Sequence, residues 1–134
     1  MAASETVIRS YYDAFNAGDV EGMLALLTED VLHDINQGAR EVGKAAFRAF
    51  LLRMAAYYRE ELRDIVVMSG EGGRRAASEF IVHGTYLATD AGLPEARGQT
   101  YVLPAGAFFE LRDGLIARVS NYYNLADWIA QVGD

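Results

Sequence analysis

The chain lacks cysteine entirely and contains only two histidines, His33 and His83. Without cysteine it can form neither a disulfide nor a reactive thiolate, which fits a reducing, cytoplasmic environment. Two histidines with no cysteine beside them are too few for a common zinc site. We therefore expect no metal and no other cofactor.

Long hydrophobic runs are also missing from the sequence. No apolar stretch approaches the roughly 18 residues that a membrane-spanning helix requires. Residues 1–5 have neither the basic nor the apolar region of an export signal. We therefore expect no membrane association and a cytoplasmic location.

The sequence has fewer basic than acidic residues. The sequence has 12 Lys and Arg against 19 Asp and Glu, so its net charge is -7. An acidic protein repels phosphate backbones, and we expect no nucleic-acid partner. Because 51% of the 134 residues are hydrophobic, the chain can bury one core. No linker or repeat divides it, which predicts a single domain over residues 1–134.

The first half of the sequence is typical of helices. Apolar residues at helical spacing predict a helix over residues 4–17, capped by Ser4 and ended by Gly18. Asp19 is a suitable cap for a short second helix. A third apolar stripe predicts a helix over residues 44–58.

The second half is rich in β-branched and aromatic residues separated by turn signals. The glycine-rich segment 70–73 and the pair Asp113-Gly114 each predict a hairpin turn. We expect a bulge near Pro104 and Gly106, because proline cannot donate a hydrogen bond to a ladder. Helices followed by strands predict an α+β domain, with three N-terminal helices on one face of a mostly antiparallel sheet. The expected strands cover 31–36, 62–68, 76–88, 99–111 and 115–123, and a closing helical turn or two covers 125–132.

Hydrogen-bonding side chains gather in the last strand and its exit, over residues 118–128. A strand that only filled a core would not need two Asn and a Ser between its aromatic residues, so the segment indicates a ligand pocket. Period-2 alternation puts Tyr122 and Asn124 on one face and Asn121 and Tyr123 on the other. Both faces carry apolar residues, and the pattern leaves open which one lines the pocket.

Five segments resemble a known family. They are YYDAFNAGD at 11–19, LTEDV at 27–31, HDINQG at 33–38, DGLI at 113–116 and RVSNYYNLADW at 118–128. In these segments and in the order of its elements, the sequence resembles the NTF2-like superfamily. That group includes ketosteroid isomerase, the SnoaL polyketide cyclases and limonene epoxide hydrolase. Segments 33–38 and 118–128 resemble its SnoaL-like, ketosteroid isomerase-related branch.

The resemblance implies a curved sheet wrapped against the helices as a cone around an apolar cavity. It also implies a homodimer formed through the outer sheet face, and a small apolar substrate or ligand. Catalytic members of the superfamily often carry an Asp near the end of the last strand. This sequence has Asn124 at the matching position, and an Asn side chain cannot take a proton at neutral pH.

Asp34, His33 and Tyr122 are the candidate catalytic residues. Burial in its short apolar strand would raise the pKa of Asp34 toward a useful range, although a turn residue or an ion pair with an Arg is the alternative. His33 suits a general acid or base, or is a structural histidine. Because the two alternate on the strand, only one can face a cavity. Tyr122 is suited to donate to a substrate oxyanion.

Further residues are candidates for holding a substrate. Glu79 has an alternative as the ion-pair partner of Arg118 or Arg75, since a lone buried carboxylate is costly. Asn124 is equally well explained as a helix cap. The alternative for Trp128 is a lid or core residue. The candidate substrate-binding set is Asn36, Asn124, Tyr57, Glu79, His83, Tyr101 and Trp128.

Together these features predict a small-molecule enzyme of ketosteroid isomerase or SnoaL type. It would act by proton transfer or water activation on an apolar, carbonyl-bearing or epoxide-like substrate. A non-catalytic ligand-binding domain and a dimeric NTF2-like interaction module are the alternatives. Two buried ionisable groups within reach of one ligand would favour the enzyme.

Overall fold

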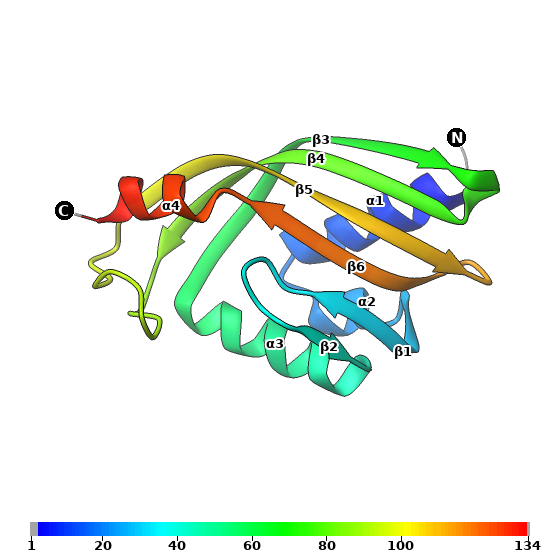
Figure 1. Ribbon diagram of the computed structural model, residues 1–134, viewed down its shortest axis with the longest axis horizontal. Helices are drawn as coiled ribbons and strands as arrows, with labels where there is room; N and C mark the ends of the chain where they lie inside the picture. Colours follow the sequence, from blue (N-terminus) through cyan, green and yellow to red (C-terminus); the bar gives the residue numbers. More distant parts are fainter. Residues whose placement is uncertain (1–2, 134) are drawn as a thin grey trace.

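A computed structural model describes residues 3–133, which form a curved six-stranded sheet with helices against its concave face (Figure 1). The elements are α1 (Ala3–Asn16), α2 (Val20–Leu24), β1 (Leu27–Asp34), β2 (Arg40–Val42), α3 (Lys44–Tyr57), β3 (Tyr58–Gly70), the 3-10 turn η1 (Glu71–Gly73), β4 (Arg75–Tyr86), β5 (Thr100–Arg112), β6 (Leu115–Tyr123) and α4 (Leu125–Val132).

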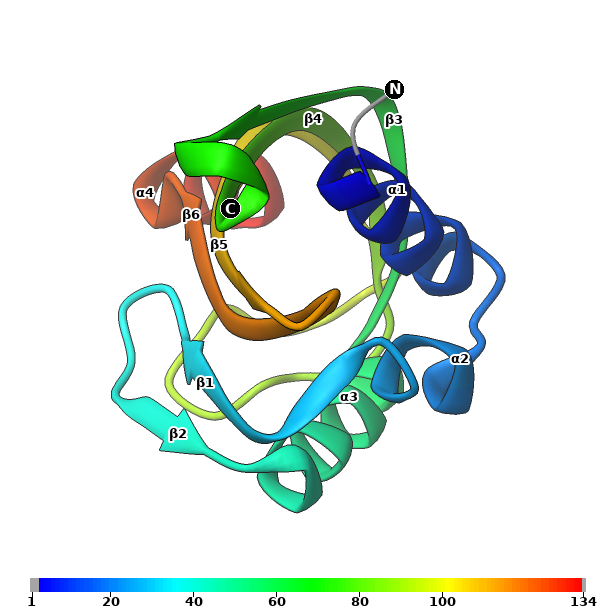
Figure 2. The same cartoon turned by 90° about the vertical axis from the view of Figure 1, so that its right-hand side faces the viewer.

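The strand order is β2-β1-β6-β5-β4-β3, and every pair is antiparallel except β1 with β6. Figure 2 looks along the long axis and shows the long strands bent into an arc, with α1, α2 and α3 on the opposite side. Helix α1 contacts β3 and β4, and α3 contacts β1. The predicted α+β fold, three N-terminal helices on a mostly antiparallel sheet, is confirmed and has the expected NTF2-like cone shape.

Helix α1 forms because its apolar residues recur on one face. Ile8, Tyr11 and Tyr12 are buried, and the Tyr12 hydroxyl lies 2.6 Å from Ser78 Oγ on the sheet. The helix ends before Gly18, whose φ of 69° lies in the left-handed region that glycine tolerates. Asp19 then caps α2 by accepting a hydrogen bond from the Gly22 N–H at 2.9 Å.

Alternate burial along β4 identifies the concave face of the sheet. Every second residue from Ala76 to Tyr86 is buried, including Phe80 and Val82. The residues between them, among them Glu79 and His83, belong to the convex face. This settles the parity of β4, and register extends the same assignment to β3 and β5.

Several boundaries differ from the sequence-based expectation. Strand β2 was not predicted, because its three residues are short of apolar character and pair only with β1. Strand β3 begins at Tyr58 instead of 62, because α3 passes into it without a loop. The expected bulge at Pro104 is absent from the regular β4–β5 ladder. Pro104 lies one residue beyond the stretch of β5 that pairs with β6, and the β5–β6 irregularity falls at Glu110 and Leu111.

Candidate functional site

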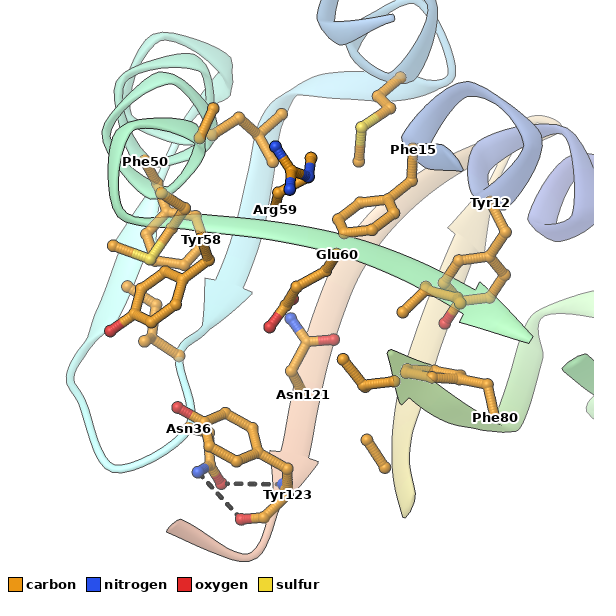
Figure 3. Close-up of a pocket in the computed structure, with 18 of the residues that line it drawn as sticks. Tyr12, Phe15, Asn36, Phe50, Tyr58, Arg59, Glu60, Phe80, Asn121 and Tyr123 are labelled. Carbon is orange, nitrogen blue, oxygen red and sulfur yellow. Dashed lines mark hydrogen bonds between the residues drawn. The ribbon is translucent and has the colours of Figure 1, made fainter. Parts of the chain in front are cut away.

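A cavity of about 800 Å³ lies between the helices and the concave face of the sheet. This volume falls in the range of pockets that hold small molecules. Its wall is largely aromatic and aliphatic, as Figure 3 shows for part of it. The apolar lining includes Tyr12 and Phe15 of α1, Phe47, Phe50 and Met54 of α3, Phe80 and Val82 of β4, Leu103 of β5 and Trp128 of α4.

A carboxyl group interrupts this apolar wall. Glu60, the third residue of β3, lines the cavity, and the Tyr101 hydroxyl donates to its Oε2 at 2.5 Å. Burial raises the pKa of Glu60, and the Tyr101 hydrogen bond partly opposes that rise. Tyr101 reaches Glu60 because β4 has no side chain at Gly84, where a Cβ atom would lie 2.2 Å from the Tyr101 ring.

An imidazole and an amide lie on another part of the wall. His33 of β1 is 2% exposed, with its ring stacked on Phe47 at 4.3 Å and set edge-on to Phe50 at 4.6 Å. Its Nε2 lies 3.4 Å from Asn121 Nδ2 on the neighbouring strand β6. Burial lowers the pKa of His33 to about 4, so the ring is neutral at pH 7.

These groups converge on the same space. Figure 3 shows the Glu60 carboxyl and the Asn121 amide pointing toward each other from β3 and β6. Asn121 Nδ2 has two hydrogens, so it can donate one to neutral His33 and still offer the other to the cavity. A group that can exchange a proton therefore faces a hydrogen-bond donor across an apolar pocket. Within residues 3–133, no three acidic or histidine side chains come close enough together to hold a metal ion.

Asp34 lies on the opposite face of β1 from His33 and does not line the cavity. The Arg40 guanidinium donates to both carboxylate oxygens at 2.6 and 3.0 Å, and Ser120 Oγ donates to Oδ2 at 2.5 Å. These hydrogen bonds, chiefly those of Arg40, lower the pKa of Asp34 to about 2. A carboxylate this acidic is a poor proton acceptor, so the geometry favours the ion-pair alternative for Asp34.

Tyr122 and Asn124 make contacts that do not involve the cavity. Tyr122 borders the cavity, yet its ring packs edge-on against Phe108 at 5.7 Å and the residue is 57% exposed. Asn124 caps α4, where its Oδ1 accepts a hydrogen bond from the Asp127 N–H at 3.1 Å. It borders a shallow hollow beside α4 and not the main cavity.

Asn36 and Trp128 are the candidate binding residues that line the cavity. The Asn36 amide is already engaged, since Nδ2 donates to the Tyr123 carbonyl at 3.1 Å. Trp128 is 4% exposed and sets its ring edge-on to Tyr58 and Tyr86. Both residues therefore shape the end of the pocket.

The remaining candidates lie outside the cavity lining. Glu79 and His83 are on the convex face, and Tyr101 acts through Glu60. The two arginines expected for Glu79 instead pair with Glu110, Arg75 at 3.1 Å and Arg118 at 3.4 Å. Tyr57 packs on Tyr58 with ring centres 6.3 Å apart.

Sequence reasoning missed Glu60 and gave Asn121 no role. Glu60 falls between the predicted helix over 44–58 and the predicted strand over 62–68, so the pattern assigns its side chain to no face. A usable signal was present, because Tyr58, Glu60 and Leu62 alternate as one face of a strand. Asn121 was within the highlighted polar segment, but only the structure shows that its face is the concave one.

Comparison with known proteins identifies the family of the chain. Residues 8–119 match the family model of the SnoaL-like domain. A proposed polyketide cyclase of Pseudomonas putida has 63% sequence identity and a TM-score of 0.95, with 99% of each chain covered. No match among curated proteins reached significance.

Two further solved structures are comparably similar. A proposed polyketide cyclase of Xanthomonas campestris has 60% identity and a TM-score of 0.95, with 98% of this chain and 97% of that chain covered. One from Silicibacter has 57% identity and a TM-score of 0.96, with 98% and 96% covered. The chain therefore belongs to the SnoaL-like domain family of the NTF2-like superfamily.

Proposed function

We propose that this protein is a small-molecule enzyme that moves a proton next to a carbonyl group of an apolar substrate, as a polyketide cyclase would. The observation that carries the proposal is Glu60, a carboxyl with a raised pKa in the wall of an apolar cavity. Titratable groups perturbed in this way gather at catalytic sites. The solved relatives described as proposed polyketide cyclases support the same reaction class.

Glu60 is the proposed general base. Its carboxylate takes the proton from the carbon beside the carbonyl, leaving a neutral carboxylic acid and an enolate. The enolate carbon then attacks a second carbonyl of the same molecule and closes a ring. The resulting alkoxide recovers the proton from Glu60, so no proton is gained or lost overall. A raised pKa makes the carboxylate a stronger base than an exposed glutamate.

The groups opposite Glu60 stabilise the negative charge that develops on the substrate oxygen. Asn121 Nδ2 faces the cavity and offers an N–H, and neutral His33 fixes the amide through its Nε2. A donor held in place before the reaction needs no reorganisation in the transition state, which is why such groups accelerate enolate formation. His33 is a positioning residue in this scheme.

Proton abstraction can be measured without knowing the natural substrate. The bicyclic ketone 2-tetralone is apolar, fits the volume of the cavity and exchanges its α-hydrogens for deuterium in D₂O. We expect the protein to accelerate this exchange, followed by NMR, above the buffer rate. Glu60→Gln should lower the protein-dependent rate by roughly 10²- to 10⁴-fold, because the isosteric amide cannot accept the proton.

Glu61→Gln is the matched control, since Glu61 is the next residue, exposed, and paired with Arg63. It should exchange as the unaltered protein does. Equal exchange by Glu60→Gln and the unaltered protein would remove Glu60 as the base.

A non-catalytic ligand-binding domain is the second candidate. The observation in its favour is Asn124, which stands where catalytic relatives often carry an Asp and which caps α4 instead. In that case the unaltered protein would bind 2-tetralone without accelerating exchange. The E60Q variant would then bind it equally well.

We also propose a homodimer formed through the convex face of the sheet. Large apolar side chains of β3, β5 and β6 are exposed there, and exposed apolar surface of this kind is typical of protein–protein interfaces. Phe108 is 53% exposed and Val102 51%. The exposed set is Val66 and Met68 of β3, Val102 and Phe108 of β5 and Tyr122 of β6.

A further inference from the structure

The cavity wall carries two arginines, Arg53 of α3 and Arg59 of β3. Both are exposed, so each guanidinium borders the cavity where the cavity meets solvent. The Arg53 guanidinium carbon lies 5.5 Å from the centre of the Phe50 ring, which is itself part of the wall. Figure 3 shows Arg59 beside Phe15, between α1 and α3. Two positive charges therefore stand at the edge of a largely apolar pocket.

Neither arginine has an ion-pair partner within the part of the chain that the structure describes. This is unusual here, because acidic residues outnumber basic ones and most basic side chains are paired. The paired ones are Arg40 with Asp34, Lys44 with Glu29, Arg48 with Glu21, Arg63 with Glu61, Arg74 with Glu71, Arg75 and Arg118 with Glu110, and Arg112 with Asp30.

The carboxylates on the cavity wall are engaged elsewhere. Glu60 accepts from Tyr101, and Asp90 accepts from the Tyr58 hydroxyl at 2.7 Å and from the Ala91 N–H at 3.0 Å. Neither carboxylate is paired with Arg53 or Arg59, so the wall offers two guanidinium groups whose N–H donors are not taken up by an internal carboxylate. An oxyanion on a ligand would complete the set, since a guanidinium binds carboxylates and similar anions through paired N–H donors.

We propose that the ligand of this cavity is an amphiphilic anion. Its apolar body occupies the pocket beside Glu60, and a carboxylate or similar group lies at the rim against Arg53 or Arg59. The proposal names the substrate class of the function proposed above and rests on that site. Cavity shape and hydrophobicity alone would accept a neutral ligand, whereas this proposal requires a negatively charged group on the ligand.

Two fluorescent probes separate the charge requirement from simple apolar binding. 8-Anilinonaphthalene-1-sulfonate carries a sulfonate, and N-phenyl-1-naphthylamine has the same aromatic skeleton without it. We expect the double variant Arg53→Gln/Arg59→Gln to weaken sulfonate binding about tenfold, as loss of charged hydrogen bonds does. Its affinity for the neutral probe should not change. The single variants then show which arginine holds the anion.

The matched control is Arg48→Gln/Arg63→Gln, which removes the same charge from the same two elements, α3 and β3. Both of its arginines are paired with acids and lie outside the cavity lining. This control should bind both probes as the unaltered protein does. Competition between the two probes confirms that they share the cavity.

Three outcomes would overturn the proposal: unchanged sulfonate affinity in the arginine variant, an equal loss for both probes, or the same loss in the control. Failure of the neutral probe to bind would instead remove the cavity as a ligand site. The probe-binding experiment tests only the requirement for an anionic group, and deuterium exchange by the Glu60→Gln variant tests only the proposed chemistry. Either proposal can therefore be disproved while the other stands.

Discussion

At the scale of single residues, the hydrogen bond from Tyr101 to Glu60 sets how strong a base the carboxylate is. The bond stabilises the charged form and so lowers the pKa that burial raises. Tyr101→Phe removes the donor, and the pKa of Glu60 should rise further. Because only the carboxylate accepts a proton, the rise of the 2-tetralone exchange rate should move to higher pH. A pH–rate profile measures this shift.

Tyr12→Phe controls for the loss of a buried phenol at the cavity wall. The Tyr12 hydroxyl is hydrogen-bonded to Ser78, whereas the Glu60 carboxyl is hydrogen-bonded to Tyr101, so the pH–rate profile of Tyr12→Phe should keep the original midpoint. If Tyr101→Phe also kept that midpoint, Tyr101 would not influence the base.

At the scale of elements, the absence of a side chain at Gly84 lets β5 place Tyr101 against β4. A Cβ atom there would lie 2.2 Å from the ring, and the ring is fully enclosed. We expect Gly84→Ala to lower the free energy of unfolding by about 1–3 kcal/mol through overpacking. Deuterium exchange should fall with it, because the ring can no longer hold its place beside Glu60. Chemical denaturation and the exchange assay measure the two effects.

Gly70→Ala is the comparison for this substitution. Gly70 ends β3 with extended backbone, and a Cβ atom there meets nothing within 4 Å. It should leave stability and exchange close to their original values. A Gly84→Ala protein as stable as Gly70→Ala would mean that Tyr101 can move aside without cost.

The elements that were predicted from sequence are those with a strong periodic pattern. Helix α1 has a clear apolar face, and β4 alternates over its whole length. Strand β2 and the start of β3 were missed, because one is short and polar and the other follows α3 without a breaker. The family and its fold were also predictable, because the quoted segments are distributed over nearly the whole chain.

The site was less predictable because it depends on which face of each strand turns inward. His33 and Asp34 are adjacent in sequence, yet one lies against Phe47 and the other is held by Arg40 on the opposite face. Asn121 reaches His33 only through the pairing of β1 with β6, 88 positions apart. Local pattern cannot supply a contact of that range.

At the scale of the whole molecule, the proposed homodimer depends on the exposed apolar side chains of the convex face. If two copies associate there, light scattering should give about twice the 14.7 kDa of one chain. Phe108→Glu should shift the protein to the monomer, since a carboxylate buried between two apolar surfaces lacks solvation.

The control for this substitution is Leu52→Glu. Leu52 is 56% exposed on α3, away from the convex face, and is comparable in exposure to Phe108. It should leave the mass unchanged. A monomeric unaltered protein, or dissociation by the control alone, would argue against this interface.

The parallel pairing of β1 with β6 has a consequence for synthesis. Glu60 and His33 belong to the first half of the chain, whereas Asn121 belongs to the last strand, which must insert between β1 and β5. A chain still emerging from the ribosome therefore exposes its aromatic wall without the strand that completes it. The pocket can close only after β6 has been synthesised, near the end of translation, and until then its apolar wall is exposed to aggregation.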